Sequence, residues 1–167
     1  MKIFLVSFLL LNFIQLSSAS ELTTYFNRDC EKALINEINK ANKNIKVAVF
    51  SFTRFSIARA LIKARQRKVN VEIIVDYHQA NTEYGNKIYE LLSQNKINVC
   101  LIKKSEGSHM HHKFTVVDDA VIVNGSFNYT TNAVKFSDEN LIVIKDRKVA
   151  SEFNQQWELL KKRKSTD

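Results

Sequence analysis

The chain has 167 residues, of which 45% are hydrophobic, and it contains no proline and only three glycines. This length is sufficient for one domain with a buried core, and with so little glycine and proline no linker or second domain is evident. The formal net charge is +8 at pH 7, from 25 Lys and Arg against 17 Asp and Glu. Such a charge suits a polyanionic partner, nucleic acid or anionic lipid, although ordinary solubility also accounts for it.

The first 19 residues predict a signal peptide. Met1 and Lys2 form a short positive segment, residues 3–16 form an apolar run, and Ser17 to Ala19 form a small-residue cleavage site. A bilayer span needs about 20 apolar residues, so this shorter run favours a cleaved leader over an anchor. We therefore expect an exported protein, periplasmic or secreted, with residues 20–167 as a single domain and no stable membrane insertion after cleavage.

The first half of this domain predicts alternating strands and helices. Apolar runs indicate strands at residues 22–26, 45–52, 69–75 and 97–102. Apolar residues at helical spacing indicate helices at residues 30–41, 57–64 and 86–93, with Asp29 and Ser56 as candidate N-caps of the first two. Residues 77–84 are expected to form a loop, in which Tyr77, His78 and Tyr84 either stack on bases or pack partially against the protein.

The second half predicts a hairpin, one more strand and a closing helix. The hairpin strands are expected at residues 114–117 and 120–123, with Asp118 and Asp119 in the turn. A strand at residues 141–144 and a helix at residues 149–160 follow. This order predicts an α/β sandwich in which a mixed central β-sheet is flanked by helices on both faces. No internal repeat is visible.

The chain has two cysteines, Cys30 and Cys100. Export would permit a disulfide between them, but their positions in the sequence do not show whether they meet. Neither is a candidate nucleophile, because a better candidate lies beside the hairpin.

Polar side chains of complementary chemistry flank the predicted hairpin. His111 and Lys113 precede it, and Ser126 and Asn128 follow it. In extended chain, residues two apart point to the same face, so a short hairpin would gather all four side chains. Lysine, serine and asparagine donate hydrogen bonds to phosphate oxygens, and histidine serves as nucleophile or general acid near neutral pH. The cluster therefore indicates chemistry on a phosphodiester.

The spacing of these residues resembles the signature of the phospholipase D superfamily. The matching elements are His111-x-Lys113-x4-Asp118 and Gly125-Ser126-x-Asn128. Within that superfamily, the chain resembles the short bacterial nucleases that carry a single copy of the motif. The resemblance covers about residues 25–157 and includes the segments 47–53 and 137–140.

The resemblance implies a role for each residue of the motif. His111 would be the nucleophile that forms a phosphohistidine intermediate, while Lys113, Ser126 and Asn128 would hold the phosphate. Glu139 lies where the superfamily places an acid that orients the histidine. Asp118 belongs to the same catalytic motif, although we expect it to support the loop rather than to contact substrate.

The chain contains one copy of the motif, whereas the mechanism of the superfamily uses two histidines, one attacking and one protonating the leaving group. The resemblance therefore implies a homodimer whose active site lies on the two-fold axis, with the second His111 supplied by the other copy.

A metal site is the alternative use of His109, His111 and His112. Zinc sites need three or four converging ligands, but neighbouring residues of a strand point to opposite faces, and the sequence contains no HExxH or paired CxxC motif. The resemblance also implies metal-independent chemistry, so we expect no metal and no cofactor.

Three functions remain open at this point. The favoured one is an exported phosphodiesterase, a nonspecific endonuclease acting on DNA, with RNA as a second substrate. The alternative is a phospholipase D that uses the same site on phosphatidyl lipids. A noncatalytic nucleic-acid-binding module would explain the charge but not the conjunction of His111, Lys113, Ser126, Asn128 and Glu139.

Overall fold

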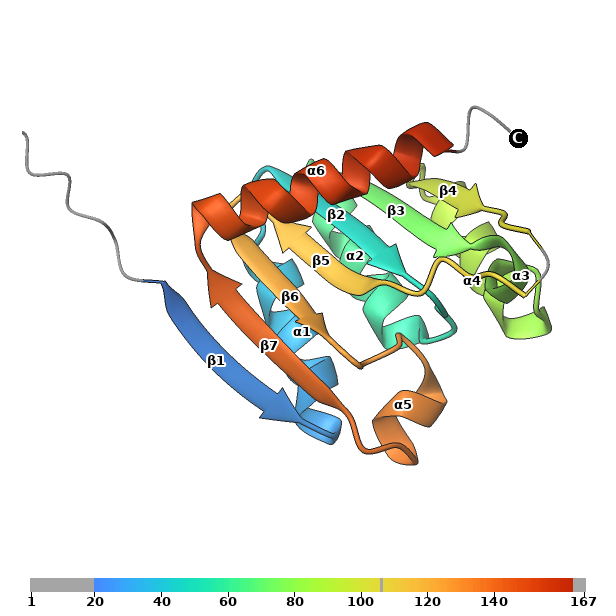
Figure 1. The fold of residues 1–167 in the computed structure, drawn as a ribbon. Coiled ribbons are helices and arrows are strands. Elements are labelled where there is room, and N and C mark those ends of the chain that lie inside the picture. Colours follow the sequence, from blue (N-terminus) through green and yellow to red (C-terminus); the bar gives the residue numbers. More distant parts are fainter. Residues whose placement is uncertain (1–19, 106, 164–167) are drawn as a thin grey trace, which may run out of the picture.

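A seven-stranded mixed sheet forms the centre of the fold (Figure 1). The computed structural model describes residues 20–105 and 107–163, so the predicted leader lies outside the described residues. The strands are β1 (Glu21–Phe26), β2 (Asn44–Val49), β3 (Asn70–Asp76), β4 (Asn98–Ile102), β5 (Lys113–Val117), β6 (Val121–Gly125) and β7 (Asn140–Lys145). The helices are α1 (Arg28–Lys40), α2 (Phe55–Gln66), α3 (Tyr77–Ala80), α4 (Glu83–Gln94), α5 (Thr131–Lys135) and α6 (Arg147–Arg163).

The strands are arranged in the order β1-β7-β6-β5-β2-β3-β4. Strands β2, β3 and β4 pair in parallel, and the remaining pairs are antiparallel. This topology follows from the connections, because helices join the parallel strands and a three-residue turn, residues 118–120, joins β5 to β6. The predicted α/β fold with a mixed sheet is confirmed.

Helices cover both faces of the sheet. Helix α6 lies across one face, and α1, α2 and α4 lie on the other (Figure 1). Successive side chains of β2 point to opposite faces of the sheet and so contribute to two hydrophobic cores. Val47 and Val49 belong to the core under α1 and α2, and Ala48 belongs to the core under α6. Trp157 is 1% exposed and donates its indole N–H to the carbonyl of Val47 at 3.1 Å, which anchors α6 to the centre of the sheet.

The two cysteines lie in different cores. Cys30 is buried on the α1 side of the sheet and Cys100 on the α6 side. Because the sheet separates them, the disulfide that the sequence left open does not form.

Both predicted N-caps are wrong. Asn27 precedes α1, and Asp29 lies in the first turn, where it pairs with Lys32. Ser56 lies inside α2, and its hydroxyl donates to the carboxylate of Glu31 on α1. In each case the side chain binds a charged partner that the neighbouring sequence pattern does not predict.

The predicted loop at residues 77–84 contains helix α3 and the start of α4. Asp76 ends β3 and caps α3, since its Oδ1 accepts the backbone N–H groups of His78 at 3.0 Å and Gln79 at 3.3 Å. In the part of the chain that the structure covers, no helix is long and apolar enough to cross a bilayer.

Candidate active site

The segment that carries His111 and Lys113 lies beside the end of β2. Lys113 is the first residue of β5 and pairs with Val49 across the sheet. The backbone N–H of Phe50 donates to the carbonyl of His112 at 2.8 Å, which extends this pairing by one residue. The ring of Phe50 then contacts both predicted site residues, at 4.6 Å between its centroid and that of His111 and 5.2 Å from the Lys113 ammonium. His111 and Lys113 therefore share one side of the chain, as their spacing predicts.

The Lys113 ammonium lies against His111. Its Nζ donates to the carbonyl oxygen of His111 at 2.9 Å and lies 3.2 Å from Nδ1 and 3.3 Å from Nε2 of the ring. Partial burial lowers the pKa of His111, and the positive charges of Lys113 and His109 lower it further. Burial also lowers the pKa of Lys113, against the opposing effect of Glu139. The imidazole is thus kept neutral at neutral pH, the state in which it has a lone pair for attack.

Ser126 and Asn128 follow the end of β6, on the strand next to β5. The antiparallel register places Phe114 opposite Asn124, so the residues after β6 lie beside the start of β5. Gly125 is required here, because a Cβ would lie 2.2 Å from the carbonyl oxygen of Asn140 on β7. The hairpin therefore brings the two predicted pairs to the same edge of the sheet.

The loop that carries Asn128 is held by buried neighbours. Phe127 and Tyr129 are each 2% exposed, and the Tyr129 hydroxyl lies 2.6 Å from the Thr115 hydroxyl on β5. Tyr129 also donates its backbone N–H to Ser51 and accepts that of Thr53. The Asn128 Oδ1 is buried and makes no hydrogen bond to the described residues.

Glu139 binds Ser126. The Ser126 hydroxyl donates to the Glu139 carboxylate and accepts the backbone N–H of Asn140 at 3.0 Å. Among the described residues, no hydrogen bond joins Glu139 to His111, although its charge raises the pKa of Lys113. The acid is thus in the cluster, and its contact is with Ser126, the residue predicted to bind phosphate.

A family match decides what this cluster is. Residues 34–160 match the family described as "Cardiolipin synthase, PLD-like domain". The chain belongs to the phospholipase D superfamily. It is therefore a phosphodiesterase of the hydrolase class, and its sheet of seven strands is the fold of that superfamily.

Relatives and solved structures agree with this assignment. The chain is 33% identical over 160 residues to a phospholipase D from Rickettsia prowazekii, covering 93% of this chain and 76% of that protein. It is 31% identical to a mitochondrial cardiolipin hydrolase from Chlamydomonas reinhardtii, covering 75% of this chain and 55% of that protein. The fold matches the phospholipase D family member Nuc from Salmonella typhimurium, with a TM-score of 0.80, 24% identity and coverage of 87% and 96% of the two chains. It also matches NucT from Helicobacter pylori, with a TM-score of 0.77, 26% identity and coverage of 85% and 96%.

Asp118, the last residue of the predicted element His111-x-Lys113-x4-Asp118, lies away from the cluster. It occupies the hairpin turn, at the opposite end of β5 from Lys113, about 16 Å along the strand. Asp118 and Asp119 each have a φ of 53°, the left-handed region that aspartate tolerates at a tight turn. The Asp118 carboxylate accepts the backbone N–H groups of the α1–β2 loop, those of Asn42, Lys43 and Asn44, at 2.7 to 3.2 Å. It supports the loop, as expected, and its inclusion among catalytic residues finds no support in this geometry.

The adjacent histidines point to opposite faces, as expected. The ring of His111 contacts Phe50, whereas the ring of His112 contacts Phe114 and lies 3.3 Å from the amide nitrogen of Gln156 on α6. Within residues 20–105 and 107–163, no three His, Cys, Asp or Glu side chains are grouped closely enough to hold a metal ion.

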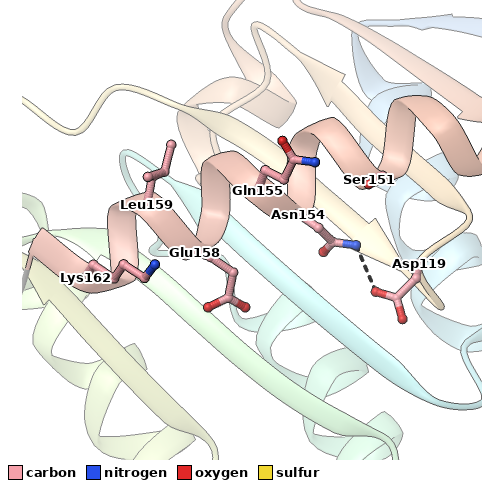
Figure 2. Close-up of a pocket in the computed structure, with 7 residues that line it drawn as sticks. All are labelled: Asp119, Ser151, Asn154, Gln155, Glu158, Leu159 and Lys162. Carbon is pink, nitrogen blue, oxygen red and sulfur yellow. Dashed lines mark hydrogen bonds between the residues drawn. The ribbon is translucent and has the colours of Figure 1, made fainter.

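A pocket of about 520 Å³ along α6 is separate from this site (Figure 2). It lies near the hairpin turn, where Asn154 donates to Asp119 at 2.9 Å. Its lining residues are Asp119, Ser151, Asn154, Gln155, Glu158, Leu159 and Lys162.

Asp76 is a residue of the site that the sequence analysis did not assign. Its side chain is fully buried, and its Oδ2 accepts the backbone N–H of Met110, the neighbour of His111, at 3.0 Å. Together with the bond between Phe50 and His112, this contact fixes the chain on both sides of His111. The sequence did contain a signal for this role. A carboxylate at the end of a buried strand must accept hydrogen bonds from buried donors.

We expect Asp76→Asn to lower kcat/KM about tenfold, because an amide cannot accept from both Met110 and the α3 backbone and leaves one buried N–H without a partner. The acid limb of the pH profile should also move to lower pH, since the Asp76 charge raises the pKa of His111. Asp146→Asn is the matched control, because Asp146 caps α6 by accepting the N–H groups of Lys148 and Val149. Equal kinetics for the two variants would contradict a positioning role for Asp76.

The acid limb of the wild-type profile is expected below pH 6.5, the ordinary pKa of histidine. Attack requires the neutral imidazole, and the pKa of His111 is lowered. As the pH falls, activity should therefore persist through 6.5 and be lost only as the pH passes the lowered pKa. The measurement is kcat/KM against pH, which reports the free enzyme. A limb centred at or above 6.5 would show that the imidazole is not shielded in this way.

Proposed function

We propose that this phosphodiesterase is an exported, nonspecific endonuclease that hydrolyses DNA, with RNA as a second substrate. The observation that carries the proposal is the convergence of His111, Lys113, Ser126 and Asn128 at one edge of the sheet. This set combines a neutral nucleophile with three hydrogen-bond donors for phosphate oxygens. The net charge of +8 favours a polyanionic substrate.

A groove beside this cluster supports nucleic acid over lipid. It has a volume of about 660 Å³ and shares Phe50 and Asn128 with the site. Its lining offers hydroxyl and amide groups and one tyrosine that is 59% exposed, Tyr84. Such groups hydrogen-bond to sugars and stack on bases. The lining residues are Phe50, Ser51, Thr53, Gln79, Thr82, Tyr84, Asn128, Thr130, Thr131 and Asn132.

The mechanism proposed has two steps. In the first, a nitrogen of His111 attacks the phosphorus, the bond to the leaving oxygen breaks, and a second histidine gives that oxygen a proton. In the second, the histidine just deprotonated accepts a proton from water, the resulting hydroxide attacks the phosphohistidine, and His111 is released with a phosphate monoester. Lys113, Ser126 and Asn128 donate to the oxygens on which charge develops. In the free protein the single O–H proton of Ser126 is donated to Glu139, so Ser126 donates to the phosphate once this hydroxyl turns from Glu139 to the substrate. Orienting His111 is a second proposed role of Glu139.

The second histidine is proposed to come from another copy of the chain. This chain carries one copy of the motif, at residues 111–128, so a two-histidine mechanism needs a homodimer with the site at its two-fold axis. Light scattering of the purified protein should give the mass of two chains, and an active monomer would contradict the arrangement.

Phospholipase D activity is the second candidate. It is supported by relatives named phospholipase D and mitochondrial cardiolipin hydrolase, which are 31 to 34% identical to this chain. The proposed chemistry does not distinguish the two candidates, because both substrates present a phosphodiester.

The decisive experiment offers the mature protein, residues 20–167, plasmid DNA or vesicles of phosphatidylcholine or cardiolipin, with a chelator present. We expect DNA to be degraded and both lipids to stay intact, with no effect of the chelator. Hydrolysis of lipid alone would move the protein to the phospholipases. Activity lost to the chelator and restored by zinc would revive a metal site, and binding of DNA without hydrolysis would indicate a noncatalytic module. Export is tested separately, by the N-terminal sequence of the protein recovered outside the cytoplasm.

A further inference from the structure

A cationic pocket lies near the groove that Phe50 and Asn128 line, because its residue His109 packs against the ring of Phe50. It has a volume of about 430 Å³ and is formed by α3 and by the connection between β4 and β5, which pass beside each other (Figure 1). Four of its six described lining residues carry a cationic or titratable basic side chain, and none of these six is acidic. The lining residues are His78, Lys103, Lys104, Gly107, Ser108 and His109.

This pocket adjoins the nucleophile through one aromatic ring. The centroid of Phe50 lies 5.4 Å from that of His109, which lines the pocket, and 4.6 Å from that of His111. A group held in the pocket would thus be a near neighbour of the phosphate that His111 attacks. The short connection means that one substrate molecule spans both positions.

A buried carboxylate joins the two walls of the pocket. Asp76 is 0% exposed, and it accepts the N–H of His78 on one wall and that of Met110, next to His109, on the other, each at 3.0 Å. One buried residue therefore forms hydrogen bonds to both walls of the pocket. These bonds hold the two segments that carry the basic side chains in a fixed position relative to each other. The pocket is therefore positioned relative to His111 by the same contact that positions His111 itself.

The two lysines of this pocket have charge to offer an anion. Among the described residues, neither Lys103 nor Lys104 forms an ion pair with a carboxylate, in contrast to Lys46, Lys87 and Lys161. The Lys103 ammonium lies 5.3 Å from the ring centroid of Tyr77, an arrangement that orients it. Among the described residues, the lining of the groove at Phe50 and Asn128 contains no charged side chain. Of these two cavities, the cationic pocket is therefore the one that offers the substrate positive charge.

We propose that the cationic pocket is a subsite for a second phosphate of the substrate, next to the phosphodiester that His111 attacks. This inference rests on the proposed phosphodiesterase chemistry and adds to it a requirement for at least two phosphates in one molecule. Polynucleotides and cardiolipin share that chemistry, whereas phosphatidylcholine and phosphatidylglycerol have a single phosphate. The pocket therefore selects against single-phosphate lipids.

The test compares dinucleotides that have one cleavable bond and differ in a terminal phosphate: TpT, pTpT and TpTp. Affinities are measured by calorimetry on the full mature chain carrying His111→Asn, so that binding is recorded without cleavage. We expect one of the two terminal phosphates to raise the affinity about tenfold, the effect of one charge-assisted hydrogen bond. Adding Lys103→Gln and Lys104→Gln should reduce this gain to less than about twofold.

The matched control adds Lys63→Gln and Lys68→Gln, which remove the same charge from an exposed part of α2 and the turn after it. This control should keep the gain from the terminal phosphate. A gain that survives in the Lys103 and Lys104 variant overturns the subsite, and so does a parent protein that shows neither this gain nor a preference for cardiolipin. Plasmid hydrolysis by the wild type tests the nuclease proposal separately, so the two can fail independently.

Vesicles identify the source of the second phosphate. Cardiolipin and phosphatidylglycerol are offered to the wild type at equal lipid phosphate. A preference for cardiolipin that the Lys103 and Lys104 variant loses would support the subsite and assign it to lipid. The same loss seen only with dinucleotides would support it and assign it to nucleic acid.

Discussion

Replacing His111 with alanine is expected to lower kcat by about 10⁴-fold or more, because in the proposed mechanism the imidazole forms the covalent intermediate and no other group replaces it. The fold should survive, since the His111 side chain is exposed. Rates are measured with plasmid DNA and with bis(p-nitrophenyl) phosphate, and unfolding by urea checks stability. The intermediate itself is sought in the wild type by a quench at alkaline pH, where phosphohistidine is stable.

The matched control for this variant is His112→Ala. His112 is the next residue, but its ring lies on the opposite face, between Phe114 and Gln156. Its contribution to the chain near the site is its backbone carbonyl, which alanine retains. The control should therefore keep most of the activity, and a His111→Ala variant as active as this control would eliminate His111 as the nucleophile.

Replacing Lys113 with alanine is expected to lower kcat by about 10²- to 10³-fold, the usual effect of removing one preorganised donor to developing negative charge. A second effect separates this role from a structural one. The Lys113 charge lowers the pKa of His111, so the acid limb of the residual activity should move to higher pH. Rates against pH, with kcat and KM resolved, provide both readouts.

Lys113→Arg tests geometry at constant charge. The compact ammonium lies within 3.3 Å of both ring nitrogens and of the carbonyl of His111, an arrangement that a planar guanidinium cannot reproduce. Partial recovery is expected. Lys63→Ala, on the exposed face of α2, controls for loss of net charge and should match the wild type. An unshifted acid limb in Lys113→Ala would contradict the electrostatic coupling to His111.

The hairpin and its flanking pairs were predictable because they depend on neighbours in sequence. Two-residue alternation sets which side chains share a face, and Asp118 and Asp119 accept the positive φ of a tight turn. The convergence of His111 and Lys113 with Ser126 and Asn128 follows from these two local facts. The mixed sheet followed from the order of strands and helices along the chain.

The caps and supporting contacts were not predictable in this way. Ser56 is a good N-cap by type, yet it bonds to Glu31, 25 residues earlier. Asp76 supports His111 through Met110, 34 residues later, and Asp118 supports a loop 74 to 76 residues earlier. A side chain takes the donor or acceptor that is near in space, and sequence distance carries no information about that.

By itself, the sequence determined the superfamily and the fold class, and it predicted which side chains carry the chemistry, because motif spacing and strand alternation are local properties. Only the tertiary structure decided that Asp118 lies about 16 Å along β5 from Lys113, that Glu139 bonds to Ser126, and that Asp76 holds the neighbour of His111. It also decided that basic residues from two separate segments line one pocket beside the nucleophile. The physical reason is that buried polar groups must be satisfied by whatever partners the packed sheet brings within hydrogen-bond distance.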